Sequence, residues 1–134
     1  SFNEDVSRWD VSNVTSMRNT FRSTPFNQDI SRWDVSKVTT FNSMFDSAAS
    51  FDQDLSSWDI ANSVSDLGDI FTNSGLSTAN YDAILIGWSA YTFTNNSINF
   101  GAAPTQYSAG AATTARGVLT SAPNNWTITD GGQA

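Results

Sequence analysis

Residues 26–45 read FNQDISRWDVSKVTTFNSMF, and two other stretches of the chain repeat this text closely. Residues 2–21 read FNEDVSRWDVSNVTSMRNTF, and residues 51–71 read FDQDLSSWDIANSVSDLGDIF. The opening phenylalanines are 24 and 25 residues apart. Self-similarity at a period of about 20 to 50 residues is typical of solenoids, propellers and other repeat arrays. The sequence therefore predicts three repeats over 1–25, 26–50 and 51–76.

Each repeat has the pattern of a short strand followed by a short helix. In the second repeat, Phe41, Met44 and Phe45 stand at i, i+3 and i+4, the spacing of one helical face. Thr39 or Thr40 would cap this helix. A Trp-Asp-aliphatic tripeptide precedes it and alternates apolar and polar side chains, as a half-buried strand does. The three tripeptides are Trp9–Val11, Trp33–Val35 and Trp58–Ile60.

The period of the repeat selects the fold class. A strand, a turn and a short helix in 24 to 25 residues lie within the ~20 to 29 residues of a leucine-rich-repeat coil. The predicted fold is α/β, a leucine-rich-repeat-like solenoid of about three strand-helix coils with a parallel sheet. Its tryptophans would stack in the core. A propeller is excluded because each blade takes roughly 40 to 45 residues and a Gly-His motif, and the chain has no histidine.

The repeat pattern ends at Leu76, and a different unit is predicted over residues 77–134. Ser77 or Thr78 would cap a helix whose apolar face holds Tyr81, Ile84, Leu85 and Trp88. A strand over 97–100, a helix over 108–122 and a strand over 126–129 should follow. A solenoid exposes its last core layer, so we expect 77–134 to be a C-terminal α/β cap of the same domain.

The first repeat has no such cap before it in this sequence. Phe2, Val6, Trp9 and Val11 would then form an uncovered core layer with an unpaired edge. We expect the chain to associate with itself through residues 1–22.

Composition limits the partners. The chain has 134 residues, no cysteine, and a net charge of −7 from 13 acidic and 6 basic residues. This balance argues against nucleic acid and against an anionic membrane, which both reward clustered Lys and Arg. No apolar run approaches the ~20 residues that a membrane-spanning helix needs.

The repeat text FNQDISRWDVSKVT, together with the closing segments NYDAILIGW and NWTITDGG, resembles one branch of the BspA-like surface proteins. That branch carries a 25-residue repeat also known from mycoplasma lipoproteins. The resemblance covers almost the whole chain. It implies a right-handed leucine-rich-repeat-like solenoid on a secreted or cell-surface protein, with adhesion or protein binding as its function and no catalytic residues. Copy three departs from the pattern, with Ser57 in place of Arg and Ala61 in place of Ser.

The residues themselves give little support to an enzyme. The absence of His and Cys removes nucleophilic triads and most zinc sites. Carboxylates recur in every repeat, but a catalytic pair needs two carboxylates in unlike environments. We therefore expect a protein that is not an enzyme and has no cofactor.

A ladder of aspartates along the strand face is the candidate ligand-binding surface. Asp10, Asp34 and Asp59 should point outward, because the Trp and aliphatic side chains beside them point inward. Flanking Arg residues could compensate the repelling carboxylates. Two interpretations stay open: a surface that binds a partner, or a solvated face with self-compensating charges. The candidate residues are Arg8, Asp10, Ser12, Arg32, Asp34, Ser36, Ser57 and Asp59.

A second column of aspartates, Asp5, Asp29 and Asp54, lies before the tripeptides. Asp in such a position caps the N–H groups of a turn. Calcium bridging these carboxylates is the alternative, since Ca²⁺ takes oxygen ligands.

The sequence favours a non-enzymatic extracellular binding or adhesion module that recognises a protein, peptide or glycan through the polar strand face. The alternative is a structural spacer that projects another domain and has no ligand. A binder should have a concave polar groove, whereas a spacer should have a flat surface with its polar groups satisfied internally.

Overall fold

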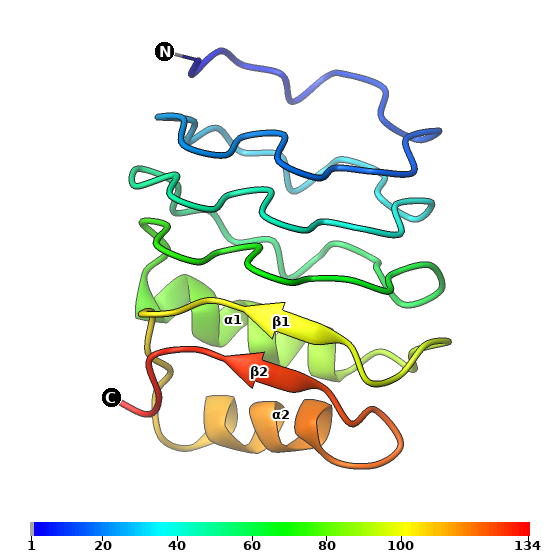
Figure 1. Cartoon of the computed structure of the whole chain (residues 1–134), viewed down its shortest axis with the longest axis vertical. Helices are drawn as coiled ribbons and strands as arrows, with labels where there is room; N and C mark the ends of the chain where they lie inside the picture. Colours follow the sequence, from blue (N-terminus) through cyan, green and yellow to red (C-terminus); the bar gives the residue numbers. More distant parts are fainter. Residues whose placement is uncertain (1) are drawn as a thin grey trace.

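Regular secondary structure is confined to the second half of the chain. A computed structural model describes residues 2–134 (Figure 1). Its elements are helix α1 (Thr78–Ser89), strand β1 (Asn99–Gly101), helix α2 (Ala111–Thr120) and strand β2 (Thr127–Thr129). The two strands form a parallel sheet in which Asn99 pairs with Thr127 and Gly101 with Thr129.

The predicted solenoid of three strand-helix coils is wrong. Between residues 2 and 76 the chain forms turns, bends and isolated bridges, with neither a helix nor a strand. The parallel sheet has two strands, and both lie in the segment that was expected to be a cap. The Trp-Asp-aliphatic tripeptides are therefore not strands, and the helix predicted over Thr39–Phe45 does not form.

The repeats are nevertheless joined side by side through their backbones. Alternate N–H groups of one repeat donate to carbonyl groups of the following segment, so the copies lie in parallel as in Figure 1. Thr40 bridges to both Ser16 and Asp66, and Leu67 bridges to Phe100 of β1. These bonds form three series, one for each pair of neighbouring segments. The first bond of each series joins a backbone N–H to a carbonyl: Met17 to Thr40 at 2.9 Å, Phe41 to Asp66 at 2.9 Å and Leu67 to Asn99 at 3.0 Å.

Positive φ angles explain why the predicted helix gives way to turns. Ser43 has φ 57° and Ser47 has φ 59°, whereas an α-helix needs every residue in the right-handed region. The intervening N–H groups make turn bonds instead, such as Met44 to the Phe41 carbonyl at 3.0 Å. The corresponding positions of the other repeats also have positive φ and carry Asn, Ser or Asp, and Asn and Asp are the residues most enriched there.

The core is a column of aromatic rings. Phe45 and Phe51 stack at a centroid distance of 3.7 Å, and Phe21 and Phe26 stack at 3.8 Å. The predicted burial of the repeat tryptophans is confirmed for Trp33 and Trp58, whereas Trp9, which was expected in an uncovered first layer, is 60% exposed. Burial of the apolar positions thus follows the sequence even where the predicted secondary structure does not.

Residues 77–134 contain the elements expected there. Ser77 caps α1 by accepting a hydrogen bond from the Asn80 N–H at 3.2 Å. The four apolar residues predicted to form its inner face are buried. In Figure 1 α1 lies behind β1, and α2 lies beyond it at the end that carries β2. The division into repeats and a cap of the same domain stays a prediction.

Candidate functional site

A polar groove of about 450 Å³ lies where the third repeat meets the two strands. It opens on the face where the repeat segments and the strands run side by side. The residues that line it, called here the polar groove, are Asn42, Ser65, Asp66, Gly68, Asp69, Ser97, Asn99, Phe100, Gly101, Thr127 and Thr129.

Two glycines shape the groove. A Cβ on Gly68 would lie 2.9 Å from the Asn42 amide nitrogen and 3.0 Å from an Asp66 carboxylate oxygen. A Cβ on Gly101 would lie 2.5 Å from the Asp69 backbone nitrogen, closer than any side chain could be placed. The absence of side chains at these two positions removes bulk from the face and lets β1 approach the third repeat.

The groove has an acidic rim with fixed hydrogen bonds. Asp66 accepts from the Gly68 N–H at 2.8 Å and from the Asn42 amide at 3.2 Å. Asp69 is exposed and accepts from the Thr72 hydroxyl at 3.1 Å. The lining contains no Lys or Arg. The third repeat, residues 51–76, holds five aspartates and no basic residue. The groove thus presents carboxylate, amide and hydroxyl groups to a ligand, and its charge opposes anions such as phosphate.

The predicted strand-face residues lie elsewhere. All of them are exposed or half-exposed, and the polar groove contains none of them. Arg32 borders a smaller hollow of about 270 Å³ with Asp5, Ser7, Gln28 and Asp29. Ser57 donates to the Ser31 carbonyl at 3.3 Å.

The predicted aspartate ladder consists of self-contained turns. Asp10 accepts from the Ser12 N–H at 3.0 Å and from its hydroxyl at 2.6 Å, and Asp34 does the same with Ser36. The Ser hydroxyl first and the backbone N–H second hold the pKa of both carboxyl groups below its usual value. Within residues 2–134, Asp59 accepts from the Ala61 N–H alone, at 3.2 Å.

The predicted compensation of these carboxylates by arginine is wrong. Within residues 2–134 the ion pairs are Arg22 with Asp46 and Arg116 with Asp130, so Arg8 and Arg32 pair with no aspartate. Serine hydroxyls and backbone N–H groups take the role that the sequence assigned to arginine.

The second aspartate column makes the turn contacts that its positions predict. Asp5, Asp29 and Asp54 each accept from the N–H of the residue two positions later at 2.9 Å. Asparagine side chains beside them link the repeats, because Asn27 accepts from the Asp52 N–H at 2.9 Å. Across residues 2–134 no three acidic side chains gather in a group that could hold a metal ion.

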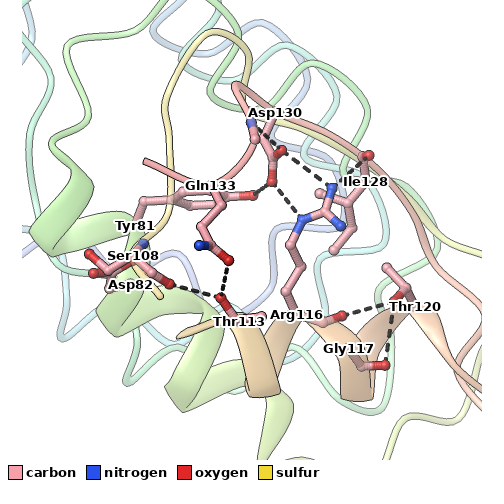
Figure 2. A network of polar contacts seen from close by, with 11 residues as sticks. Tyr81, Asp82, Ser108, Thr113, Arg116, Gly117, Thr120, Ile128, Asp130 and Gln133 are labelled. Carbon is pink, nitrogen blue, oxygen red and sulfur yellow. Dashed lines mark hydrogen bonds and ion pairs between the residues drawn. The ribbon is translucent and has the colours of Figure 1, made fainter. Parts of the chain in front are cut away.

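Figure 2 shows a buried polar network that joins the helices to β2. Asp130, with a side chain 2% exposed, accepts from the Tyr81 hydroxyl at 2.6 Å and from Arg116 at 2.8 Å. Burial raises the pKa of Asp130, but the bonds from Arg116, Tyr81 and the Gly132 N–H outweigh it and lower the pKa. Burial and the Asp130 carboxylate raise the pKa of Tyr81. All three side chains are engaged with one another, so the network holds α1, α2 and β2 together and offers no reactive group.

Sequence reasoning missed both the groove and this network. One signal for the groove was present: Gly68 follows Leu67, whereas Arg18 and Asn42 follow the matching Met17 and Phe41. A glycine in place of polar side chains indicates a position on that face where no side chain fills the surface. The network had no comparable signal, since its residues are 14 and 49 positions apart.

The repeats, the shared backbone bonds and the acidic groove define a repeat protein of stacked turns. The chain belongs to the family described as Mycoplasma protein of unknown function, DUF285, whose sequence model matches residues 1–108. Comparisons with curated proteins and with solved structures gave no match. In the part of the chain that the structure describes, neither helix has the length and apolarity that a membrane span requires.

Proposed function

We propose that this chain is a non-enzymatic binding module that holds a cationic segment of a partner protein or peptide in the polar groove. The groove itself is the observation that carries the proposal, because it combines about 450 Å³ of concave surface with carboxylate, amide and hydroxyl groups. It replaces the Asp10, Asp34 and Asp59 face as the proposed binding surface, since none of these three aspartates lines the groove.

Electrostatics favours Lys or Arg as the group recognised. Asp66 and Asp69 lie in the groove without a basic neighbour in its lining. A guanidinium or ammonium group donates hydrogen bonds only, and it would find carboxylate, amide and hydroxyl oxygens as acceptors. A glycan, which donates and accepts, is the second ligand class that this lining suits.

The place of action proposed is the outside of the cell. The resemblance of the repeats to BspA-like surface proteins supports a secreted or surface-anchored adhesion module. The partner would then be an extracellular protein or peptide.

A structural spacer is the second candidate function, and a specific observation favours it. The aspartates of the repeat turns each bond one carboxylate oxygen to their own turn, and backbone bonds join each repeat to the next. Repeats joined in this way suit a stalk that projects another domain.

The experiment compares binding of Lys- and Arg-rich peptides with that of the same peptides carrying acetyl-lysine and citrulline, by calorimetry at low and physiological salt. The test variants are Asp66→Asn and Asp69→Asn. At position 66, asparagine keeps a side-chain oxygen that can accept the hydrogen bond from the Gly68 N–H. At position 69, asparagine tolerates the positive φ of 52°. We expect weakening of about tenfold or more for the double variant.

Asp59→Asn is the matched control, because it removes one charge from the same repeat, keeps a turn acceptor and lies outside the groove. Binding that the control weakens as much as the groove variants would refute the groove as the site. A glycan array run in parallel separates the two ligand classes. If no basic peptide and no glycan binds, the spacer function is favoured.

A further inference from the structure

The polar groove has a floor without side chains. A bridge pairs Leu67 with Phe100, so the residues that follow them, Gly68 and Gly101, are neighbours on adjacent segments of the stack. These segments lie side by side in Figure 1. Both glycines line the groove. They leave two successive layers of its surface without a side chain, and the two together are called here the glycine floor.

Side chains stand at both ends of the glycine floor. Asn42 lies at one end, since its amide nitrogen would be 2.9 Å from a Cβ on Gly68. Thr129 lies at the other end, paired with Gly101. Hydrogen-bonded neighbours are about 4.8 Å apart, so three such steps make a trough of roughly 14 Å between these two residues. The trough is long enough for one extended side chain and the backbone that carries it.

The charges of the groove lie on one side of this trough. Asp66 and Asp69 both belong to the third repeat. Asp69 uses one carboxylate oxygen for its bond from the Thr72 hydroxyl, and within residues 2–134 its second oxygen accepts no hydrogen bond. The lining residues on the other side are uncharged: Ser97, Asn99, Phe100, Gly101, Thr127 and Thr129. The groove therefore offers a place for one cationic group and not a row of such places.

The shape of the trough favours the side chain of arginine over that of lysine. A guanidinium group is planar and carries five N–H donors in a fork, so it can lie flat on a surface without side chains and donate to two carboxylates. An ammonium group is a compact point charge with three donors. It is also the more strongly hydrated of the two, so partial enclosure in a groove costs it more.

We propose, on the basis of the function proposed above, that the polar groove recognises a single arginine side chain of the partner. The guanidinium lies over Gly68 and donates to Asp66 and to the second oxygen of Asp69. The peptide backbone that carries the arginine lies at the strand end of the trough. There the exposed side chains of Asn99 and Thr127 make no hydrogen bond within residues 2–134, so they are free to bond a peptide group.

Calorimetry of the whole chain with four peptides tests the proposal. The peptides are identical, blocked at both ends and otherwise uncharged, and they carry one central arginine, lysine, citrulline or asymmetric dimethylarginine. We expect the arginine peptide to bind at least tenfold more tightly than the lysine peptide. Citrulline, which has no charge, and dimethylarginine, which keeps the charge but cannot form the paired hydrogen bonds, should also bind more weakly than arginine.

Gly68→Ala is the test variant of the protein, since its Cβ would occupy the glycine floor 2.9 Å from the Asn42 amide nitrogen and 3.0 Å from an Asp66 oxygen. It should weaken binding of the arginine peptide about tenfold or more. Gly117→Ala is the matched control, because it makes the same change in α2 with nothing within 4 Å. Circular dichroism and urea unfolding establish that both variants fold, and the peptide comparison on the parent protein decides if Gly68→Ala does not.

The outcomes separate arginine recognition from the function proposed above. A lysine peptide that binds as tightly as the arginine peptide overturns arginine recognition and leaves that function intact. Binding that requires several basic residues in a row does the same. If no basic peptide binds at concentrations up to about 1 mM, both proposals fail. Arginine binding that a folded Gly68→Ala variant leaves unchanged overturns the placement of the guanidinium on the glycine floor.

Discussion

The indole N–H of Trp58 donates a hydrogen bond of 3.0 Å to the backbone carbonyl of Ile30, one repeat earlier in the chain. Trp33 and Val6 form the same contact in the preceding repeat, and Trp88 of α1 extends it to Leu55. All three bonds are buried. Each tryptophan thus satisfies a polar group of the layer before it while filling the core, and α1 uses the same contact as the repeats.

Trp58→Phe should destabilise the protein by roughly 1 to 3 kcal/mol, because it removes the buried indole bond to the Ile30 carbonyl, which keeps only the bond from the Trp33 N–H, and because it opens a cavity. Urea unfolding followed by circular dichroism measures the loss. Trp9→Phe is the control and should change the free energy of unfolding by less than about 0.5 kcal/mol, since Trp9 has no such acceptor in residues 2–134. Equal effects of the two substitutions would contradict this role of the indole bond.

Asp130 should make stability depend on acid pH. Its pKa is lowered in the folded protein, so its contribution is complete above the unfolded value near 3.8 and is lost as pH falls through the folded pKa. Asp130→Asn should cost about 3 kcal/mol at pH 7 and flatten the decline between about pH 5 and pH 2. Thermal unfolding across this range measures both effects.

Asp46→Asn is the control for that experiment. It removes an ion pair with Arg22, whose side chain is largely exposed, and should cost less than about 1 kcal/mol. If stability falls as steeply between about pH 5 and pH 2 in Asp130→Asn as in the parent protein, other carboxyl groups cause the loss of stability in acid.

Gly101→Ala should destabilise the protein by about 1 to 3 kcal/mol, because its Cβ would collide with the Asp69 backbone. Gly117→Ala makes the same chemical change within α2, where nothing lies within 4 Å of the new atom. It should stabilise the protein by about 0.5 to 1 kcal/mol through helix propensity. Chemical denaturation compares the two, and a neutral Gly101→Ala would argue against close approach of β1 and the third repeat.

Ser36→Ala should raise the pKa of Asp34 toward its usual value. The Ser36 hydroxyl is the largest cause of the lowered pKa, and the backbone N–H remains as a second donor, so part of the shift should persist. NMR titration of the Asp34 carboxyl carbon measures it. Ser43→Ala, which removes a hydroxyl bonded to Asn42 instead, should leave the Asp34 titration unchanged.

The pattern of burial could be predicted from the sequence better than the secondary structure. The spacing of Phe41, Met44 and Phe45 predicts a single apolar face, and all three residues are buried, but this spacing fits a run of turns as well as a helix. The deciding factor was the backbone of the neighbouring repeat, whose carbonyls accept the N–H groups that a helix would keep for itself. Helix α1 was predictable because its cap and its apolar face are both local signals.

The candidate site was less predictable because it depends on contacts between segments distant in sequence. Asp66 and Thr127 line the same groove although 61 residues separate them, and no repeat signal links them. The aspartates chosen from the sequence recur because every turn needs one, as their bonds to nearby N–H groups show.

The sequence alone determined which residues repeat, which of them are apolar enough to be buried, and where a capped helix begins, because each of these is a local property of composition and spacing. Only the tertiary structure decided that the repeats become stacked turns instead of strands and helices, and where a groove opens. A backbone N–H can donate either to a carbonyl of its own segment or to a carbonyl of the neighbouring segment. Which of the two bonds forms depends on how the segments pack against one another.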